Sequence, residues 1–296
     1  MTAPISGAPR YKKEIVRQAS LKEKLKPQAQ KRRLEMAMYK FSNHLMFAIV
    51  MQNENLCRQF IERLFTGRKV KEINMLTTEK TIISNIKSKS VRLDVLFVGD
   101  EKVYDIEMQV QDEPFLPQRS RYYHSSMDTH LLKSGAGYEE LRESYVIFIC
   151  LHDPVGKNEP MYFFEMYDRK LDLKLGDGSF TILLDVKCPA GKIPKELESF
   201  FDYVAAEKID DHDEFIKEIH QRVEEVNQDA EVVEIMTLEE DFKARNRIAY
   251  KQGRKEGLSE GEMVGKQETA LKMCAEGFDA DLIKKITGLS PEDYQA

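Results

Sequence analysis

Polar and apolar residues alternate along two neighbouring segments of the chain, Val91–Val98 and Val103–Val110. Because successive side chains of a strand point to opposite faces of a sheet, the alternation predicts two strands that share one apolar face. That face comprises Val91, Leu93, Val95, Phe97, Tyr104, Ile106, Met108 and Val110. We expect it to lie in the hydrophobic core.

The remaining pattern predicts a chain of mixed helices and strands. Helical periodicity in residues 34–65, interrupted near Ser42 and Asn53, indicates two helices. Pro117 suits the first turn of a helix that runs to about Lys133. Further strands are predicted at Val70–Met75, Thr81–Lys87, Tyr145–Leu151, Met161–Met166 and Phe180–Val186, and amphipathic helices at Lys195–Lys208 and Asp213–Val226.

The polar face of the two alternating strands carries acidic side chains. A two-residue turn at Asp100 and Glu101, or a four-residue turn at Gly99–Lys102, gives the same register. In that register Asp94 lies directly opposite Glu107. Opposed side chains have Cβ atoms about 4.5 to 5.5 Å apart, so two carboxylates in this arrangement repel each other.

A divalent cation between the two carboxylates would convert that repulsion into ligation. Magnesium suits the set, since it takes hard oxygen ligands from one or two carboxylates and leaves its other positions to water and phosphate. Asp105 and Gln109 flank Glu107 on the same strand and complete the polar face. The pattern also fits the solvated face of a half-buried hairpin, and alternation alone leaves both interpretations open.

Several segments together resemble the recombination-promoting nuclease/putative transposase (Rpn) family, a branch of the PD-(D/E)XK nucleases. The resemblance covers most of the chain after about residue 35. The segments that carry it are Phe41–Phe47, Asn55–Phe65, Ser90–Val95, Tyr104–Gln109, Leu116–Tyr123, Ser144–Cys150, Gly176–Gly178 and the glycine-spaced tail. The family implies a restriction-endonuclease-like α/β fold, in which a mixed sheet is flanked by helices, followed here by a C-terminal helical region.

The resemblance also implies roles for individual residues. Asp94 and Glu107 would be the catalytic carboxylates that bind Mg²⁺ or Mn²⁺. Gln109 occupies the place where many relatives carry a catalytic lysine; it can orient a water but supplies no positive charge. Asp105 is a second candidate for positioning that water.

A group of DNA contacts is expected on the helix that begins near Pro117. Gln118 and Tyr122, four residues apart on one helical face, resemble the Gln-x-x-x-Tyr motif of related nucleases. Arg119 and Arg121 lie beside them and would hold phosphates. An ordinary amphipathic helix explains the same residues equally well.

One departure from the family bears on activity. Relatives carry an acidic residue early in the first core helix, at a place that matches Asn43 or His44, and neither residue here is an acid. We therefore expect a metal-dependent DNA endonuclease linked to recombination or mobile elements. The alternative is a catalytically degenerate DNA-binding or interaction protein that retains the fold.

Charge is unevenly distributed along the chain. The net charge is -6, yet residues 10–40 contain eleven basic and three acidic residues, a balance of 11 - 3 = +8. This basic N-terminal arm, residues 1–34, either binds the DNA backbone or is a solvated leader. The chain has neither a membrane-length apolar stretch nor a signal-peptide core, so we expect a cytoplasmic protein without a membrane partner.

The C-terminal region has a different composition. A nuclease-like domain is expected at residues 35–193, followed by a helical region at 194–296. Gly253, Gly257, Gly261 and Gly265 recur every fourth residue in a polar, helix-like segment. Each glycine costs a helix about 1 kcal/mol relative to alanine. Close helix packing in a homo-oligomer would offset that cost, while a flexible charged linker is the other interpretation.

Overall fold

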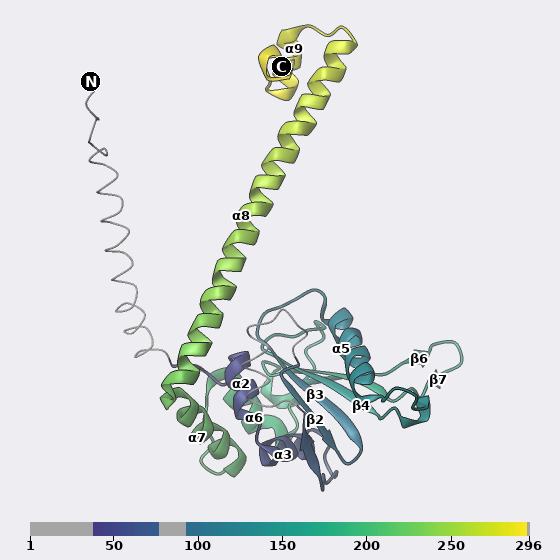
Figure 1. Cartoon of the computed structure of the whole chain (residues 1–296), viewed down its shortest axis with the longest axis vertical. Coiled ribbons are helices and arrows are strands. Elements are labelled where there is room, and N and C mark those ends of the chain that lie inside the picture. Colours follow the sequence, from purple (N-terminus) through teal and green to yellow (C-terminus); the bar gives the residue numbers. More distant parts are fainter. Residues whose placement is uncertain (1–37, 77–92, 295–296) are drawn as a thin grey trace, which may run out of the picture. The chain divides into compact units, whose positions relative to one another are not determined.

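The computed structural model describes residues 38–76 and 93–294. The chain divides into two compact units, one that runs through Thr237 and one that begins at Leu238. The first unit holds a mixed sheet with helices, and the second is helical (Figure 1). The expected fold class is therefore confirmed. The first unit extends past residue 194, where we expected a domain boundary.

Strands β1 to β5 and β8 form a mixed sheet within the described residues, in the order β1-β2-β3-β4-β8-β5. Neighbouring strands are antiparallel from β1 to β3 and parallel from β3 through β4 to β8, and β5 is antiparallel to β8. A separate ribbon pairs β6 with β7. The strands are β1 (Ile73–Met75), β2 (Val95–Gly99), β3 (Lys102–Gln109), β4 (Ser144–Cys150), β5 (Met161–Phe164), β6 (Tyr167–Asp168), β7 (Leu173–Lys174) and β8 (Ser179–Asp185).

Helices cover both faces of this sheet, with α5 on one side and α2, α3, α6 and α7 on the other (Figure 1). The helices are α2 (His44–Val50), α3 (Glu54–Leu64), α5 (Leu116–Leu131), α6 (Lys195–Ala206), α7 (Glu214–Gln228), α8 (Ala230–Ala275), α9 (Ala280–Thr287) and α10 (Pro291–Tyr294), with short 3₁₀ turns at Tyr138–Glu140 and Ala190–Lys192. The first unit is thus a three-layer arrangement.

The larger core lies between the sheet and the helices α2, α3, α6 and α7. Alternate side chains of β2 and β3 point into this core, as the sequence pattern predicts. They are Val95, Phe97, Tyr104, Ile106 and Met108, and all are buried. The apolar face predicted for the two segments is wrong at two positions. Val110 follows the last residue of β3 and is 48% exposed, and Leu93 packs against the opposite core. Residue 91 lies outside the described residues.

A second core fills the space between the sheet and α5. It comprises Leu96, Val98, Val103, Leu116, Tyr123, Met127, Val146, Phe148, Cys150 and Leu183. The polar face of β2 and β3 is therefore covered by a helix. The interpretation of this face as a solvated surface is wrong.

The turn between β2 and β3 fixes their register. Asp100 and Glu101 adopt positive φ values of 46° and 64°, as the two central residues of a type I′ hairpin turn do. The Asp100 carboxylate also accepts hydrogen bonds from the backbone N–H groups of Lys71 and Glu72. The two-residue turn expected from the sequence is confirmed, with Val95 opposite Ile106.

Helices α2 and α3 begin close to the two residues, Ser42 and Asn53, at which the helical pattern of the sequence is interrupted. Asn43 and Asn53 cap α2 and α3, each accepting hydrogen bonds from two backbone N–H groups of the first turn. Helix α5 begins at Leu116 with Pro117 in its first turn. The strand predicted at Thr81–Lys87 lies outside the described residues. The other predicted strands match observed elements with ends shifted by up to four residues, since β2 begins at Val95 and not at Val91. In the helical pattern predicted from residue 34, the described residues 38–43 are not helical, and α2 begins at His44.

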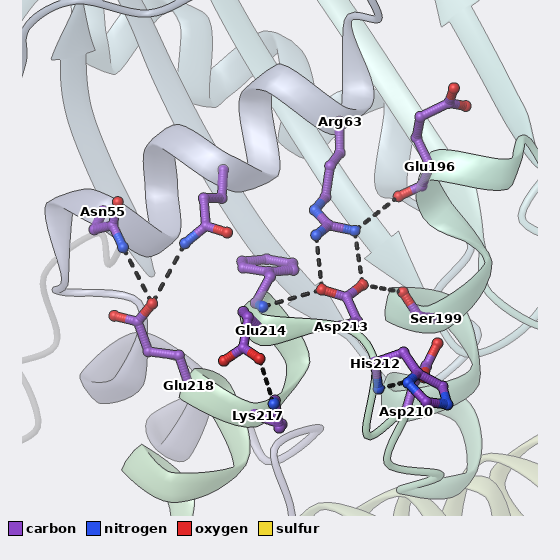
Figure 2. A network of polar contacts seen from close by, with 12 residues as sticks. Asn55, Arg63, Glu196, Ser199, Asp210, His212, Asp213, Glu214, Lys217 and Glu218 are labelled. Carbon is purple, nitrogen blue, oxygen red and sulfur yellow. Dashed lines mark hydrogen bonds and ion pairs between the residues drawn. The ribbon is translucent and has the colours of Figure 1, made fainter.

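A polar network fastens α3 to α6 and α7 (Figure 2). The Arg63 guanidinium donates two hydrogen bonds of 2.8 Å to the Asp213 carboxylate and lies 4.6 Å from the Phe215 ring centre. Asp213 also accepts hydrogen bonds from Ser199 Oγ and from the Phe215 backbone N–H. On the same side, Glu218 accepts hydrogen bonds from the side-chain amides of α3 and its cap. These contacts join α3, α6 and α7 into one helical layer.

The second unit consists of most of α8 with α9 and α10. Ala270, Ile283, Leu289 and Tyr294 form a small core between the end of α8 and the two short helices. Asp279 caps α9, and Gly288 ends it with a φ of 76°. The short helices predicted from the sequence at Ala280–Ile286 and near Ser290 are observed, whereas the expected helix at 270–275 is the last part of α8.

Candidate active site

The candidate site lies on the face of the sheet that α5 covers. The alternation along β3 directs Asp105, Glu107 and Gln109 to this face, and Asp94 joins them from the residue before β2. All four are buried, with exposed fractions of 0% for Asp105, 3% for Glu107, 5% for Gln109 and 6% for Asp94. Three carboxylates thus share a site from which most water is excluded.

Asp94 and Glu107 lie across from each other and are tied together through the backbone. The Asp94 N–H donates a hydrogen bond of 2.9 Å to Glu107 Oε1, and the Met108 N–H donates one of 3.3 Å to Asp94 Oδ2. The register of β2 on β3, continued by one residue, sets the two carboxylates opposite each other. The pairing expected from the sequence is therefore observed.

Asp105 has an unusual environment. Its Cα lies opposite Leu96 on β2 and Val146 on β4, and both neighbours are apolar. Its two carboxylate oxygens are buried and accept no hydrogen bond within the described part of the chain. A buried acid without donors is costly in its charged form.

Burial and mutual repulsion raise the pKa values of two of these acids. For Asp105, burial is the main cause, followed by the charge of Asp94, while Arg119 opposes the shift. For Glu107, burial again comes first, followed by Asp94 and then Asp105. Both pKa values lie well above those of ordinary carboxyl groups, so the two acids retain protons more readily than exposed acids do.

Arg119 brings a positive charge to this cluster from α5. Its Nη1 donates a hydrogen bond of 2.7 Å to Gln109 Oε1, and its Nη2 lies 3.3 Å from Glu107 Oε2. The same guanidinium bonds Glu113 and the Tyr123 hydroxyl at 3.0 Å each. Gln109 also donates from Nε2 to the Gln111 carbonyl, so its amide is fixed at both ends.

The four residues of α5 that we expected to contact DNA do not lie on one side of the helix. Arg119 faces the carboxylates, whereas Gln118, Arg121 and Tyr122 are exposed. The motif Gln118-x-x-x-Tyr122 therefore lies on the outer surface of the helix, and the pair that contacts the site is Arg119 and Tyr123. Tyr123, which the sequence analysis did not single out, is 8% exposed and packs against Phe148.

Arg121 borders a second polar cluster under α5, which the sequence analysis also did not find. His124 bonds the hydroxyls of Ser144 at 2.7 Å and Thr181 at 3.3 Å, and Ser120 bonds Thr181. Burial lowers the pKa of His124 to about 4, so its imidazole is neutral at physiological pH. Ser120, Arg121, His124 and Thr181 line a pocket of about 380 Å³. Ser120, His124 and Thr181 hydrogen-bond one another there.

Asn43 and His44 are the two residues at the start of the first core helix where we expected an acid from the family resemblance, and neither is acidic. Asn43 uses its side-chain oxygen to cap α2, where it accepts from the N–H groups of Leu45 and Met46 at 3.0 and 3.3 Å. His44 is the first residue of α2 and is partly buried. The basic arm at residues 1–34 lies outside the described residues.

A magnesium-type site fits the residues present better than a closed structural metal site does. Within residues 38–76 and 93–294, no three acidic, histidine or cysteine side chains are gathered tightly enough to hold a metal ion. Mg²⁺ needs only one or two carboxylates and takes water and phosphate at its other positions. The opposed pair Asp94 and Glu107 offers two carboxyl groups of the kind that such an ion takes.

The sequence matches the PD-(D/E)XK nuclease family transposases over residues 38–256. Comparison with curated proteins and with solved structures gave no match. Among the described residues, no helix is both long enough and apolar enough to cross a membrane. PD-(D/E)XK nucleases generally use divalent metals and act on DNA. Because the match covers most of the chain and includes the whole carboxylate cluster under α5, the protein belongs to the PD-(D/E)XK nuclease family transposases.

Proposed function

We propose that the protein is a metal-dependent DNA endonuclease that hydrolyses phosphodiester bonds, with a role in recombination or in mobile elements. The observation that carries the proposal is the cluster of Asp94, Asp105 and Glu107, three acids within one buried site. Burying three carboxylates costs free energy that no hydrophobic gain at these positions offsets. A cation-dependent activity gives a reason for that cost.

Asp94 and Glu107 are the proposed metal ligands. Asp94 directly precedes β2 and Glu107 lies on the neighbouring β3, and their carboxylates accept hydrogen bonds from the backbone N–H groups of Met108 and Asp94. When bound, Mg²⁺ or Mn²⁺ would activate a water and stabilise the charge that develops on the phosphate. This chemistry assigns two carboxylates to the metal and leaves Asp105 for another role.

The remaining residues of the site would position the water and the substrate. Arg119 holds the Gln109 amide in one orientation, so this amide can accept a hydrogen bond from the attacking water or donate one to it. Asp105, whose pKa burial raises, can take a proton from a water at the site. Arg119 supplies the positive charge that Gln109 lacks in place of the family's lysine.

The outer surface of α5 is the proposed contact for the DNA backbone. Gln118, Arg121 and Tyr122 are exposed there, one helical turn or less from Arg119. Arginine and amide side chains bind phosphate oxygens without regard to sequence. The basic arm at residues 1–34 is proposed to add salt-dependent affinity.

Plasmid cleavage tests the function. The wild type, Asp94→Asn, Glu107→Gln and the control Asp112→Asn are incubated with Mg²⁺, with Mn²⁺ and with a chelator. Asp112 is a matched control because it comes only three residues after Gln109 and its side chain is 85% exposed. We expect cutting that requires metal, is lost in the first two variants and survives in the control. Cutting that persists in Asp94→Asn would overturn the assignment.

A second candidate function is a DNA-binding protein that has lost catalysis. It is favoured by Asn43, whose side chain serves as a helix cap, and by His44, since neither supplies the family's early acid. Wild-type protein that shifts DNA in a gel but does not cut it with either metal would support this alternative. Under it, His44→Asp should raise the affinity for Mn²⁺ measured by calorimetry.

We also propose that copies of the chain associate through the glycine-spaced part of α8. A Cβ atom built at Gly253, Gly257, Gly261 or Gly265 would meet no other atom within 4 Å. These glycines therefore relieve no contact inside the chain. Close approach of a second helix would give them a use.

A further inference from the structure

The middle of α8 carries a run of positive charge. Residues 242–255 contain six basic residues and no acidic one, although the net charge of the chain is -6. Every residue of this run is exposed. Within residues 38–76 and 93–294, a salt bridge reaches the run only at Lys243, which pairs with Glu239 at 3.5 Å. The charges that follow Lys243 are therefore open to an anionic partner.

Four of the basic residues share one side of α8. At 3.6 residues per turn, positions that are three, four, seven, eight and eleven residues apart fall on one face of a helix. Counted from Arg247, these positions hold three further basic residues, one tyrosine and one leucine. We call the six residues the basic stripe: Arg247, Tyr250, Lys251, Arg254, Lys255 and Leu258.

Acidic residues near the basic stripe lie on another side of α8 or further along it. Glu256 follows Arg247 by nine residues, which is two and a half turns, so it points to the opposite side. On the side of the stripe, the nearest acids are Glu240, seven residues before Arg247, and Glu262, seven residues after Lys255. Seven residues rise by about 10 Å, roughly one Debye length at physiological salt. The four positive charges of the stripe are therefore little compensated by the helix itself.

We propose that the basic stripe binds the phosphate backbone of duplex DNA. The proposal rests on the proposed DNA substrate and adds a contact surface in the second unit of the chain. The helix rises by about 12 Å from Arg247 to Lys255, and each strand of B-DNA carries a phosphate about every 3.4 Å along its axis. Four basic side chains thus face about three to four phosphates of one strand.

Tyr250 adds to the same surface. It lies between Arg247 and Arg254 on the stripe and is 71% exposed. Its hydroxyl can donate a hydrogen bond to a phosphate oxygen, as tyrosine side chains do in DNA complexes. A backbone contact of this kind positions the duplex and reads no sequence.

An anionic membrane is another polyanion that a basic helix can bind. A helix that lies in a membrane interface needs an apolar face opposite its basic one. The side of α8 opposite Arg247 instead carries Gln252, Glu256 and Glu260. Duplex DNA requires no apolar face, so the distribution of residues around α8 favours DNA.

The salt dependence of DNA binding tests the proposal. Full-length protein is titrated into a fluorescent duplex at several NaCl concentrations, with a chelator present, and anisotropy measures the binding constant. One variant carries Arg247→Gln and Lys251→Gln. The matched control carries Arg245→Gln and Lys266→Gln, which removes two charges from other sides of α8. Glutamine, arginine and lysine have similar helix propensities, so both variants keep the helix.

We expect the slope of log Kobs against log[salt] to become shallower by about 1.8 in the stripe variant, or about 0.9 for each lost phosphate contact. The control should change the slope by less than about 0.5, since its residues face away from the duplex. Equal slopes in the two variants would overturn the proposal, and so would a wild type that binds no duplex.

The nuclease proposal is tested separately. No metal is available in these titrations, so a loss of cleavage cannot be mistaken for a loss of binding by the stripe. Wild-type protein that cuts plasmid with Mg²⁺, together with equal slopes in the two variants, would keep the nuclease function and overturn the role of the stripe. A shallower slope in the stripe variant alone, without any cleavage by the wild type, would support the stripe and leave the nuclease proposal to fail by itself.

Acetylation of lysines maps the contact in the wild-type chain. The protein is treated with an acetylating ester, with and without duplex, and mass spectrometry measures the reaction of each lysine. We expect Lys251 and Lys255 to lose most of their reactivity when duplex is present, while Lys284, exposed on α9, keeps its own. Unchanged reactivity of Lys251 and Lys255 would overturn the proposal. Protection by phosphatidylserine vesicles but not by duplex would assign the stripe to a membrane and overturn it as well.

Discussion

Arg119 on α5 and Gln109 on β3 are joined by a hydrogen bond of 2.7 Å from Nη1 to Oε1, which anchors the covering helix to the candidate site. The same guanidinium reaches Glu107, a proposed metal ligand, at 3.3 Å. One side chain therefore fixes the orientation of the amide and the carboxylate together. The planar fork of arginine permits this, whereas lysine would offer a single charged point.

We predict that Arg119→Lys lowers kcat/KM for plasmid cleavage by about 10- to 100-fold, the range found when outer partners of metal ligands are lost. Lysine keeps the charge, but its single nitrogen replaces the two that bond Gln109 and Glu107 separately in the arginine fork. The matched control is Arg169→Lys, an exposed arginine outside the site. Steady-state kinetics at fixed Mg²⁺ would measure both. Equal losses in the two variants would mean that Arg119 acts through general charge and does not position Gln109.

We next predict a pH dependence from Asp105. Its pKa is raised in the folded protein, so the folded state binds this proton at pH values where the unfolded chain has released it. Its contribution to stability is therefore greatest below the unfolded pKa of about 4 and declines as the pH rises towards the folded pKa. Asp105→Asn removes this titration while keeping the shape of the side chain.

The comparison of Asp105→Asn with the wild type isolates that contribution from other acids. Without metal, we expect the stability of the variant relative to the wild type to increase from pH 4.5 to pH 8. Urea unfolding at several pH values would measure it. A difference in the free energy of unfolding that stays constant with pH would show that Asp105 is charged throughout this range.

The site's carboxylates could be predicted from the sequence because strand geometry has a period of two. Alternation and a two-residue turn suffice to set Asp94 opposite Glu107, and both features are observed. Their burial could not be predicted in the same way. The covering helix α5 buries Ser120 and His124 as well as apolar residues, so its apolar pattern does not show which side faces the sheet.

That weak pattern also explains the error on α5. Four-residue spacing holds for Gln118 with Tyr122 and for Arg119 with Tyr123, and only the rotation of the helix distinguishes the two pairs. The rotation is set by contacts that are distant in sequence, among them His124 with Ser144 and Thr181. The boundary expected at residue 194 failed to mark the end of the first unit for a related reason. Helices α6 and α7 have acidic outer faces, but they bury Phe200 and Phe215 in the larger core.

Asp213 is predicted to contribute to stability in a way that weakens at low pH. Burial tends to raise its pKa, but hydrogen bonds from Ser199 and Arg63 outweigh it, and the net shift is downward. A lowered pKa means that the contribution is complete above the unfolded pKa of about 4 and is lost as pH falls through the folded value. Asp213→Asn should cost about 2 kcal/mol at pH 7 and less at pH 3.5. Urea unfolding beside the exposed control Asp211→Asn would measure it, and a cost that grows towards low pH would contradict the ion pair with Arg63.

Metal binding is predicted to stabilise the fold most where the carboxylates are charged. A ligand that binds only the folded state adds RT ln(1 + [L]/Kd), or about 2.7 kcal/mol at a hundredfold excess over Kd. Below the raised pKa values of Asp105 and Glu107, protons compete with the ion, so the gain in Tm from Mg²⁺ should be larger at pH 8 than at pH 5. Thermal unfolding with Mg²⁺, and with the same concentration of a monovalent chloride as control, measures that gain. Asp94→Asn should abolish it at both pH values, since it removes a proposed ligand. A gain that persists in this variant would locate the bound ion elsewhere in the protein, and the three acids under α5 would then need another explanation.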